Sequence, residues 1–252
     1  MNVKSIVALA VALVCTTAHA ADSYSGDAYL LDGGALVYSE THYLFDGEHL
    51  VVYTCPDGGA FARKSIHINP DPQAPDFSLI NARIGYREGV RGTGAAREIF
   101  VQRAPDQPEK TAALDLPPDG VIDAGFDVYV RRHWDALVRG DTLRFAFLVP
   151  SKRTFYAFDL AKVDGPRTAP SVTLRLSLGA WYAFLAPHID VTYERATRRL
   201  LRFTGMSNMR DAKLKNLNVR IEFPHAPTPA TAEEIAAARD ATLATSCAES
   251  GQ

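Results

Sequence analysis

Three segments in the second half of the chain alternate strictly between apolar and polar residues: Val172–Leu178, Ile189–Glu194 and Leu217–Phe223. A period of two places the apolar side chains of a strand on one face. One buried face and one solvated face are typical of antiparallel sheets. Leu143–Val149 and Phe155–Leu160 are more uniformly apolar, so we expect both of their faces to be covered. The chain is therefore predicted to fold mainly as antiparallel sheet.

Turn-forming residues divide the first third of the chain at Asp32–Gly34, Asp46–Gly47 and Pro56–Gly59. Such Gly-containing clusters favour tight turns between paired strands. The segments between them are rich in Tyr, Val, Leu and Ile and are predicted to be consecutive hairpin strands: Ala35–Phe45, His49–Thr54 and Ala60–Ile68. We expect roughly ten strands in all, while residues 83–97, which mix Gly with Arg, receive no assignment.

Two stretches have the period of a helix. In Ile122–Leu137 the apolar residues recur at intervals of three or four, and Asp123 is placed to cap the start. Asp127 and Arg131 are spaced for an ion pair on its polar face. The second stretch, residues 231–245, is Ala-rich and is predicted to be a C-terminal helix.

The N-terminal segment has the layout of a secretory signal peptide. Lys4 precedes an apolar run from Ile6 to Val14, and Ala18-His19-Ala20 is a small-x-small cleavage pattern. The run is shorter than the roughly 20 residues that span a bilayer. We therefore predict cleavage after Ala20 and an exported chain, periplasmic or secreted, without a transmembrane segment.

Cleavage would remove Cys15 and leave Cys55 and Cys247. An even cysteine count in an oxidising compartment favours a disulfide, and neither residue belongs to a CxxC motif. We predict a Cys55–Cys247 bridge that staples the C-terminal segment to the N-terminal hairpins. In the chain-entropy model, closing so long a loop stabilises the fold by about 4–5 kcal/mol.

The composition is that of an ordinary folded protein. The 252 residues are 47% hydrophobic and 22% charged, with a formal net charge of −2. Without the predicted signal peptide, residues 1–20, the length suits one domain with ample core. We predict that residues 21–252 form a single exported β-rich domain. Such a mild charge gives no reason to expect nucleic-acid binding.

Common catalytic signatures are missing from the sequence, which has no phosphate-binding loop, HExxH, CxxC or GxSxG. The histidines are scattered. Because of the turn at Asp46–Gly47, His49 is predicted to lie opposite residue 44 and not to meet His42. We predict neither a metal site nor a cofactor.

Acid–base catalysis stays open, because carboxylates from distant strands can converge in space. The candidates are Asp76, Glu88, Asp123 and Asp127. Each also has a structural interpretation: Asp123 caps a helix, Asp127 pairs with Arg131, and Asp76 and Glu88 lie in polar loops.

Charge is distributed unevenly along the chain. Residues 21–62 contain seven acids and no Lys or Arg, whereas residues 195–220 contain eight bases and one acid. One interpretation is that the first and last strands are neighbours and attract each other. The other is that the basic hairpin faces an anionic partner, such as lipid headgroups or an envelope polymer.

Several short motifs resemble a family of uncharacterised exported bacterial proteins. They are Pro75-Asp76-Phe77, Gly85-Tyr86-Arg87-Glu88-Gly89, Asp123-Ala124-Gly125-Phe126-Asp127, Trp134-Asp135-Ala136-Leu137 and Phe147-Leu148-Val149-Pro150-Ser151. That family has no assigned activity, so the resemblance carries over no catalytic residue. The closing hairpin Arg198–Phe223 is more loosely similar to the last strands of lipoprotein-localisation-factor-like half-barrels, whose antiparallel sheet holds acyl chains around a helix. Fold similarity does not by itself establish function.

The predicted fold is α+β: a curved, mainly antiparallel, half-barrel-like sheet wrapped around the single helix Ile122–Leu137, with a C-terminal helix. Aromatic residues are more numerous than one sheet face needs. They fill a core if the sheet closes over the helix, or line an apolar cleft if it stays partly open.

The leading hypothesis is a non-enzymatic periplasmic protein that binds a hydrophobic or amphipathic, lipid-like ligand. The residues predicted to line its cavity are Phe126, Val130, Trp134, Phe145, Phe147 and Phe155, and Arg199 and Arg202 would meet an anionic headgroup. One alternative is a hydrolase of a cell-envelope component, with Asp76, Glu88 and Asp127 as acids or bases. The other is a structural or interaction module without a ligand.

Overall fold

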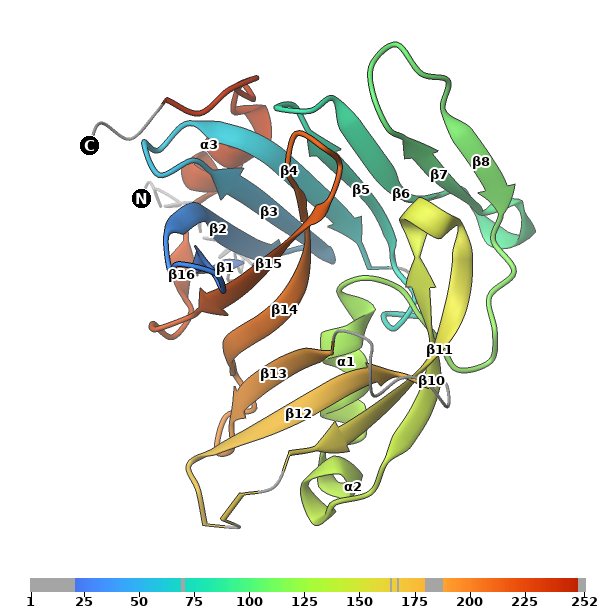
Figure 1. Cartoon of the computed structure of the whole chain (residues 1–252), viewed down its shortest axis with the longest axis vertical. Helices are drawn as coiled ribbons and strands as arrows, with labels where there is room; N and C mark the ends of the chain where they lie inside the picture. The colour runs from blue at the N-terminus through green and yellow to red at the C-terminus, as the bar shows by residue number, and fades with distance from the viewer. Residues whose placement is uncertain (1–20, 69–70, 164, 167, 180–187, 249–252) are drawn as a thin grey trace, which may run out of the picture.

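The computed structural model of the protein describes residues 21–68, 71–163, 165–166, 168–179 and 188–248 (Figure 1). The strands are β1 (Ala21–Leu30), β2 (Leu36–Phe45), β3 (Glu48–Thr54), β4 (Ala60–His67), β5 (Asp76–Asn81), β6 (Tyr86–Arg91), β7 (Glu98–Gln102), β8 (Lys110–Ala113), β9 (Gly120–Val121), β10 (Leu143–Val149), β11 (Thr154–Lys162), β12 (Ser171–Leu178), β13 (Ile189–Glu194), β14 (Leu200–Arg210), β15 (Asn216–Glu222) and β16 (Thr228–Ala230). The helices are α1 (Gly125–Arg132), α2 (Trp134–Arg139) and α3 (Ala232–Asp240), with 3-10 turns at Gly94–Ala96 and Pro150–Lys152. The predicted signal peptide and its cleavage site after Ala20 lie outside the described residues.

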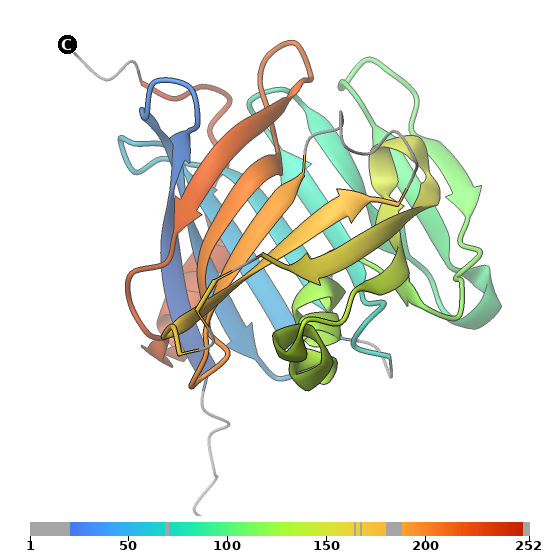
Figure 2. The same cartoon turned by 60° about the horizontal axis from the view of Figure 1, so that its bottom comes forward.

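One large mixed sheet contains the strands of the described chain. They follow the order β8-β7-β6-β5-β4-β3-β2-β1-β15-β14-β13-β12-β11-β10-β9, and β16 pairs with β1. In the described part of the sheet, neighbouring strands are antiparallel, except for β9 and β10, which are parallel. The sheet is not closed, since this order ends at β8 and β9. Figure 2 shows the strands side by side along a curved surface.

The sequence pattern predicted the main strands correctly. The strictly alternating segments form β12, β13 and β15, and the predicted hairpin segments form β2, β3 and β4. The uniformly apolar pair β10 and β11 is covered only in part. Phe145 and Leu160 pack into one hydrophobic cluster and Leu148 and Phe155 into another, but Tyr156 on β11 is 39% exposed. The described sheet has 16 strands rather than the expected ten. Among those missed are the short strands β8, β9 and β16.

Two hydrophobic clusters fill the interior. The first packs strands β2–β7 against β14 and β15, with Tyr38, Phe61 and Met209 fully buried at its centre. The second lies between α1, α2 and strands β10–β13, around Val130 and Leu160. Leu200 and Phe203 of β14 contact both clusters.

The predicted helix Ile122–Leu137 is divided into two short helices. His133, between α1 and α2, has φ −103° and ψ 14°, which is not a helical conformation. Val130 and Leu137 are fully buried, as the apolar period predicted. Helix α2 ends at Gly140, whose φ of 110° is a left-handed conformation that favours glycine.

The prediction that Asp123 caps this helix is wrong. Ala124 occupies the capping position of α1, and no side chain caps the helix. Asp123 itself has φ 44°, and its carboxylate accepts hydrogen bonds from Lys64 Nζ at 2.8 and 3.0 Å. The mostly buried Lys64 ammonium on β4 therefore binds the Asp123 carboxylate, which the sequence predicted to cap the helix.

Helix α3 is shorter than the predicted 231–245 and packs on the outer face of the sheet. A capping box joins Thr231 and Glu234 at its start. Ala238 contacts Leu50 and Val52 of β3. None of the described helices is long and apolar enough to cross a membrane.

The predicted disulfide between Cys55 and Cys247 is confirmed. The two Cα atoms are 5.6 Å apart and 192 residues apart in the chain. The tail is also held by backbone contacts, since Ala244 N donates to Ala60 O at 2.7 Å and Ala248 N to Asp57 Oδ2 at 2.8 Å. A disulfide fits the oxidising compartment of an exported protein.

Candidate functional site

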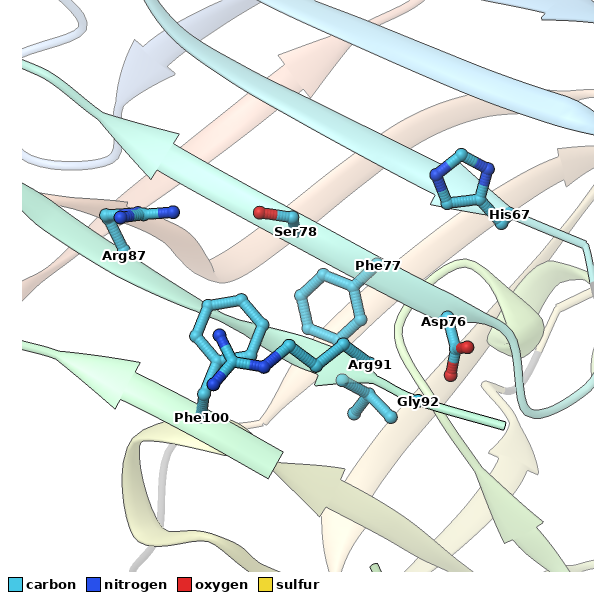
Figure 3. Close-up of a pocket in the computed structure, with 9 residues that line it drawn as sticks. His67, Asp76, Phe77, Ser78, Arg87, Arg91, Gly92 and Phe100 are labelled. Carbon is cyan, nitrogen blue, oxygen red and sulfur yellow. The ribbon is translucent and has the colours of Figure 1, made fainter. Parts of the chain in front are cut away.

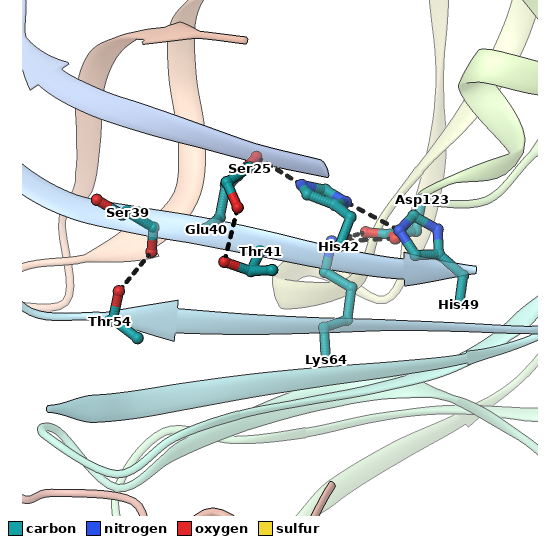
Figure 4. Close-up of polar contacts among 9 residues, drawn as sticks. All are labelled: Ser25, Ser39, Glu40, Thr41, His42, His49, Thr54, Lys64 and Asp123. Atoms are coloured by element: carbon teal, nitrogen blue, oxygen red, sulfur yellow. Dashed lines mark hydrogen bonds and ion pairs between the residues drawn. The ribbon is translucent and has the colours of Figure 1, made fainter. Parts of the chain in front are cut away.

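Two parts of the described structure gather polar side chains. One is a trough on the outer face of β4–β7 (Figure 3). The other lies on the opposite face of β2–β4, which points into the core (Figure 4). We call this second set the inner polar cluster; it consists of Glu40, His42, His49, Lys64 and Asp123.

Strand register places the inner polar cluster on one face. His42 and Lys64 both lie directly opposite Val51, which is 1% exposed. Directly opposed residues share a face of the sheet, so both side chains point toward the core. Asp123 reaches the cluster from the turn before α1.

Lys64 and Asp123 form an ion pair with little solvent around it. Their side chains are 10% and 17% exposed. Burial alone would lower the pKa of the Lys64 ammonium, but the Asp123 carboxylate, with Tyr53 and Glu40, raises it above its usual value. Lys64 is therefore charged throughout the physiological pH range.

Glu40, His42 and His49 form a hydrogen-bonded chain. His42 Nε2 lies 3.0 Å from Glu40 Oε1, and His42 Nδ1 lies 2.9 Å from His49 Nε2. The prediction that His49 lies opposite residue 44 is confirmed, since it pairs with Leu44. The conclusion that it does not meet His42 is wrong, because diagonal neighbours on one face are within reach of long side chains.

The hydrogen-bond partners in this chain constrain where its protons lie. Burial lowers the pKa of His49 well below its usual value, and the positive charges of His42 and Lys64 lower it further. A carboxylate only accepts hydrogen bonds, so His42 Nε2 carries the proton toward Glu40. The bond between the rings then runs from His49 to His42 when His42 is neutral, and from His42 to His49 when His42 is protonated.

Aromatic rings enclose the cluster. Tyr24 stacks on His42 with ring centroids 4.5 Å apart, and Phe223 meets the same imidazole edge-on at 5.8 Å. Tyr53 is 2% exposed, and burial raises the pKa of its hydroxyl. Within the described residues, no three His, Cys, Asp or Glu side chains are placed to hold a metal ion.

The other predicted acids are each held by a separate partner. Asp76 pairs with Arg97 at 2.8 Å, and Asp127 pairs with Arg131 at 2.6 Å as its spacing predicted. Glu88 accepts a hydrogen bond from Tyr86 Oη at 2.6 Å. These acids therefore do not converge on one reacting centre.

The prediction that Asp76 and Glu88 lie in polar loops is wrong. Asp76 begins β5 and Glu88 lies within β6, where it is 4% exposed. Burial raises the pKa of Glu88, while the Tyr86 hydrogen bond and the Arg210 charge lower it, and the net shift is upward. The surrounding glycines had suggested a loop, but β6 pairs with both β5 and β7.

The predicted ligand-lining residues occupy three environments. Val130, Phe145 and Trp134 are buried, at 0%, 2% and 5% exposed, in the second hydrophobic cluster. Phe126 and Phe147 are partly exposed at the edge of that cluster. Phe155 lies apart from them, because it packs against the first cluster on the other face of β11.

Partly exposed rings continue the second cluster toward the surface. Phe147 meets Phe126 and Phe158 edge-on, with centroids 6.2 and 6.1 Å away. We call Phe126, Phe147 and Phe158 the aromatic stack. Each has one side on the buried cluster and another open to solvent.

The two predicted headgroup arginines are engaged within the protein. Arg199 donates to the carbonyls of Phe223 and His225 at 3.0 and 2.9 Å, and Arg202 pairs with Glu222 at 2.9 Å. The guanidinium near the helical segment is instead Arg198, 5.6 Å from the ring centre of Trp134.

The acidic and basic segments are neighbours, since β1 pairs with β15. The attraction expected between them is not what holds them together. Described ion pairs of the basic segment use Glu194, Glu222, Asp135 and Glu88, all outside residues 21–62. Asp27 even lies opposite Glu222, and it accepts a hydrogen bond from Ser39 instead.

Comparison with known proteins does not show a family for this chain. No protein-family model matches the chain, and no curated protein sequence is similar to it.

The sequence did not predict that Glu40, His42, His49 and Lys64 belong to one cluster. The available signal was strand parity, because Tyr38, Glu40 and His42 lie on one face of β2 and Tyr38 is fully buried. Polar residues at inward positions are uncommon and are usually hydrogen-bonded.

Proposed function

We propose that the protein is an exported, non-enzymatic binding protein for a hydrophobic or amphipathic ligand. The observation that carries this proposal is the aromatic stack, whose partly exposed rings extend a fully buried apolar cluster. An acyl chain laid along these rings would continue the packing of the cluster and remove apolar surface from water.

The helical segment supports the same proposal. Phe126 lies on α1, whereas Phe147 and Phe158 lie on β10 and β11. The aromatic stack therefore joins the helical segment to the sheet. In this proposal the curved sheet acts as a half-barrel that α1 and α2 fill in part, and the ligand lies on the exposed side of the stack.

A hydrolase is supported less well. His42, oriented by Glu40, has the partner of a general base. Both of its ring nitrogens are already hydrogen-bonded, however, to Glu40 and to His49. Taking a proton from a substrate would therefore require one of these bonds to break.

An interaction module without a ligand is the second candidate. Its support is the packed interior, in which Val130, Leu160 and Leu174 are fully buried. Such a protein would keep its core filled and would bind its partners through its surface alone.

Native mass spectrometry distinguishes these candidates. The protein would be purified under native conditions from the exported fraction of its own cells and then extracted with organic solvent. A stoichiometric amphiphile is expected, and its amount should fall in Phe147→Ser but not in Leu31→Ser. Leu31 is a large apolar residue, 46% exposed, outside the aromatic stack. An empty wild-type protein at its mature mass would contradict the carrier proposal and favour the interaction module.

A further inference from the structure

The outer face of β4–β7 carries a trough lined by both apolar and polar side chains. Ser78 and Phe100 lie directly opposite Gly89 on the two neighbouring strands. A Cβ at Gly89 would come within 2.8 Å of the Phe100 ring and 2.0 Å of the Phe77 carbonyl oxygen. The lack of a side chain at Gly89 lets the Phe100 ring pack closely against the strand. Beside it the trough has a volume of about 350 Å³, which is within the range of small-molecule sites, about 300–1,000 Å³.

Two arginines and a histidine line this outer trough (Figure 3). Arg87 and His67 lie at opposite ends, and the Arg91 guanidinium lies over the Phe100 ring. The Arg91 guanidinium is 4.5 Å from the centre of the Phe100 ring and is fixed by Glu98 and Glu109 at 2.8 and 2.6 Å. The Arg91 guanidinium therefore covers the Phe100 ring, which is 2% exposed.

Arg87 differs from Arg91 in having no acidic partner. It is exposed, and its strand neighbours are Ile80 and Gln102. Within the described part of the chain it forms no ion pair. A guanidinium free to bind two oxygens at once is suited to a carboxylate.

Polar groups that suit hydroxyls complete the lining. Asp76 is held by Arg97 at 2.8 Å, and its strand partner His67 stands beside it. The Ser78 hydroxyl lies between them and Arg87 in Figure 3. A carboxylate such as Asp76 repels a bare anion but accepts hydrogen bonds from hydroxyl groups.

We propose that the outer trough binds an acidic saccharide. The carboxylate of one sugar ring pairs with Arg87, hydroxyls of that ring and of the next bond to Ser78, Asp76 and His67, and the rings rest against the Arg91 guanidinium. This binding is independent of any amphiphile, because the trough lies on the outer face of β5–β7 and the aromatic stack lies on α1, β10 and β11.

Calorimetric titration at low ionic strength tests the proposal. The probes are a tetramer of galacturonic acid, the same tetramer as its methyl ester, and inorganic phosphate. The acidic tetramer is expected to bind the wild-type protein, and the ester and phosphate to bind at least about tenfold more weakly, since one charge-assisted bond contributes about 1.5–3 kcal/mol.

Two charge-matched variants locate the site. Arg87→Gln should weaken binding of the acidic tetramer by about tenfold or more. Arg103→Gln removes the same charge from an exposed position just beyond β7 and should leave binding unchanged. Thermal melting of both variants establishes that they are folded.

Four results would overturn the proposal. They are no binding of the acidic tetramer, equal binding of its methyl ester, equal binding of phosphate, and equal losses in the two variants. No binding would mean that the trough is not a saccharide site, and equal binding of the ester would mean that the carboxylate is not recognised. Equal binding of phosphate would make the trough a simple anion site. Equal losses in the two variants would mean that the attraction is a general charge effect.

Discussion

His42 Nδ1 lies 2.9 Å from His49 Nε2, although the two residues belong to different rungs of the β2–β3 ladder. Burial lowers the pKa of His49 well below its usual 6.5, and the charges of His42 and Lys64 lower it further. The folded protein therefore resists a proton that the unfolded chain accepts. The stability contributed by neutral His49 is fully present above about pH 6.5 and is lost as the pH falls below it.

We predict that His49→Gln flattens the pH dependence of stability between pH 5 and pH 7. One proton changes the slope by up to about 1.4 kcal/mol per pH unit. Denaturant unfolding at several pH values measures this slope. His225→Gln, at an exposed position, serves as the control and should follow the wild-type curve. Parallel curves for His49→Gln and wild type would contradict the prediction.

Removing one partner of the Lys64–Asp123 pair should be costly. Lys64→Met leaves the mostly buried Asp123 carboxylate without its ammonium, and we expect a loss of about 3–5 kcal/mol at neutral pH. Asp123→Asn keeps a residue that tolerates the φ of 44° and should also destabilise the fold.

The double variant Lys64→Met/Asp123→Asn separates pairing from packing. The double variant has no unpaired charge. Its loss of unfolding free energy should therefore be clearly smaller than the sum of the losses in the two single variants. Urea unfolding of the four proteins provides the double-mutant cycle. Additive losses would mean that the two side chains do not stabilise each other.

The Cys55–Cys247 bridge should contribute strongly to stability. Its loop of 192 residues corresponds to about 5 kcal/mol in the chain-entropy model. We predict that replacing both cysteines by Ser lowers the unfolding free energy by about 2–5 kcal/mol and speeds hydrogen exchange at Ala244 and Ala248. Reduction of the wild-type protein should reproduce both effects. Unchanged protection of these amides would mean that α3 and its backbone contacts hold the tail without the bridge.

Local patterns in the sequence were sufficient for most of the sheet. Alternation fixed β12, β13 and β15, and the turn at Asp46–Gly47 fixed the register that pairs His49 with Leu44. Contacts between strands distant in the sequence were not accessible in this way. Strand β6 was missed because Gly89 reads as a loop residue, although its lack of a side chain makes room for the Phe100 ring.

The inner polar cluster was missed for a similar reason. Lys64 and Asp123 are 59 residues apart, and nothing local connects a lysine on a strand with an aspartate before a helix. The break at His133 was also hidden, because the apolar period of Ile122–Leu137 continues across it. Periodicity specifies which side chains are buried, but not whether the backbone between them stays helical.

Gly125, the first residue of α1, should be intolerant of any side chain. A Cβ there would lie 1.9 Å from the carbonyl oxygen of Gln73. That oxygen also accepts a hydrogen bond from Ile122 N at 3.1 Å, and the Gln73 side chain accepts one from Arg132 Nη1 at 3.0 Å. Helix α1 is thus held near its start by the Gln73 backbone and at its end by the Gln73 side chain.

We predict that Gly125→Ala destabilises the protein by about 1–3 kcal/mol, the usual cost of overpacking. Gly165→Ala is the control, because a Cβ there would meet no atom of the described residues within 4 Å, and it should change stability by less than about 0.5 kcal/mol. Urea unfolding measures both. If α1 instead shifts at little cost, Gly125→Ala will unfold like the control.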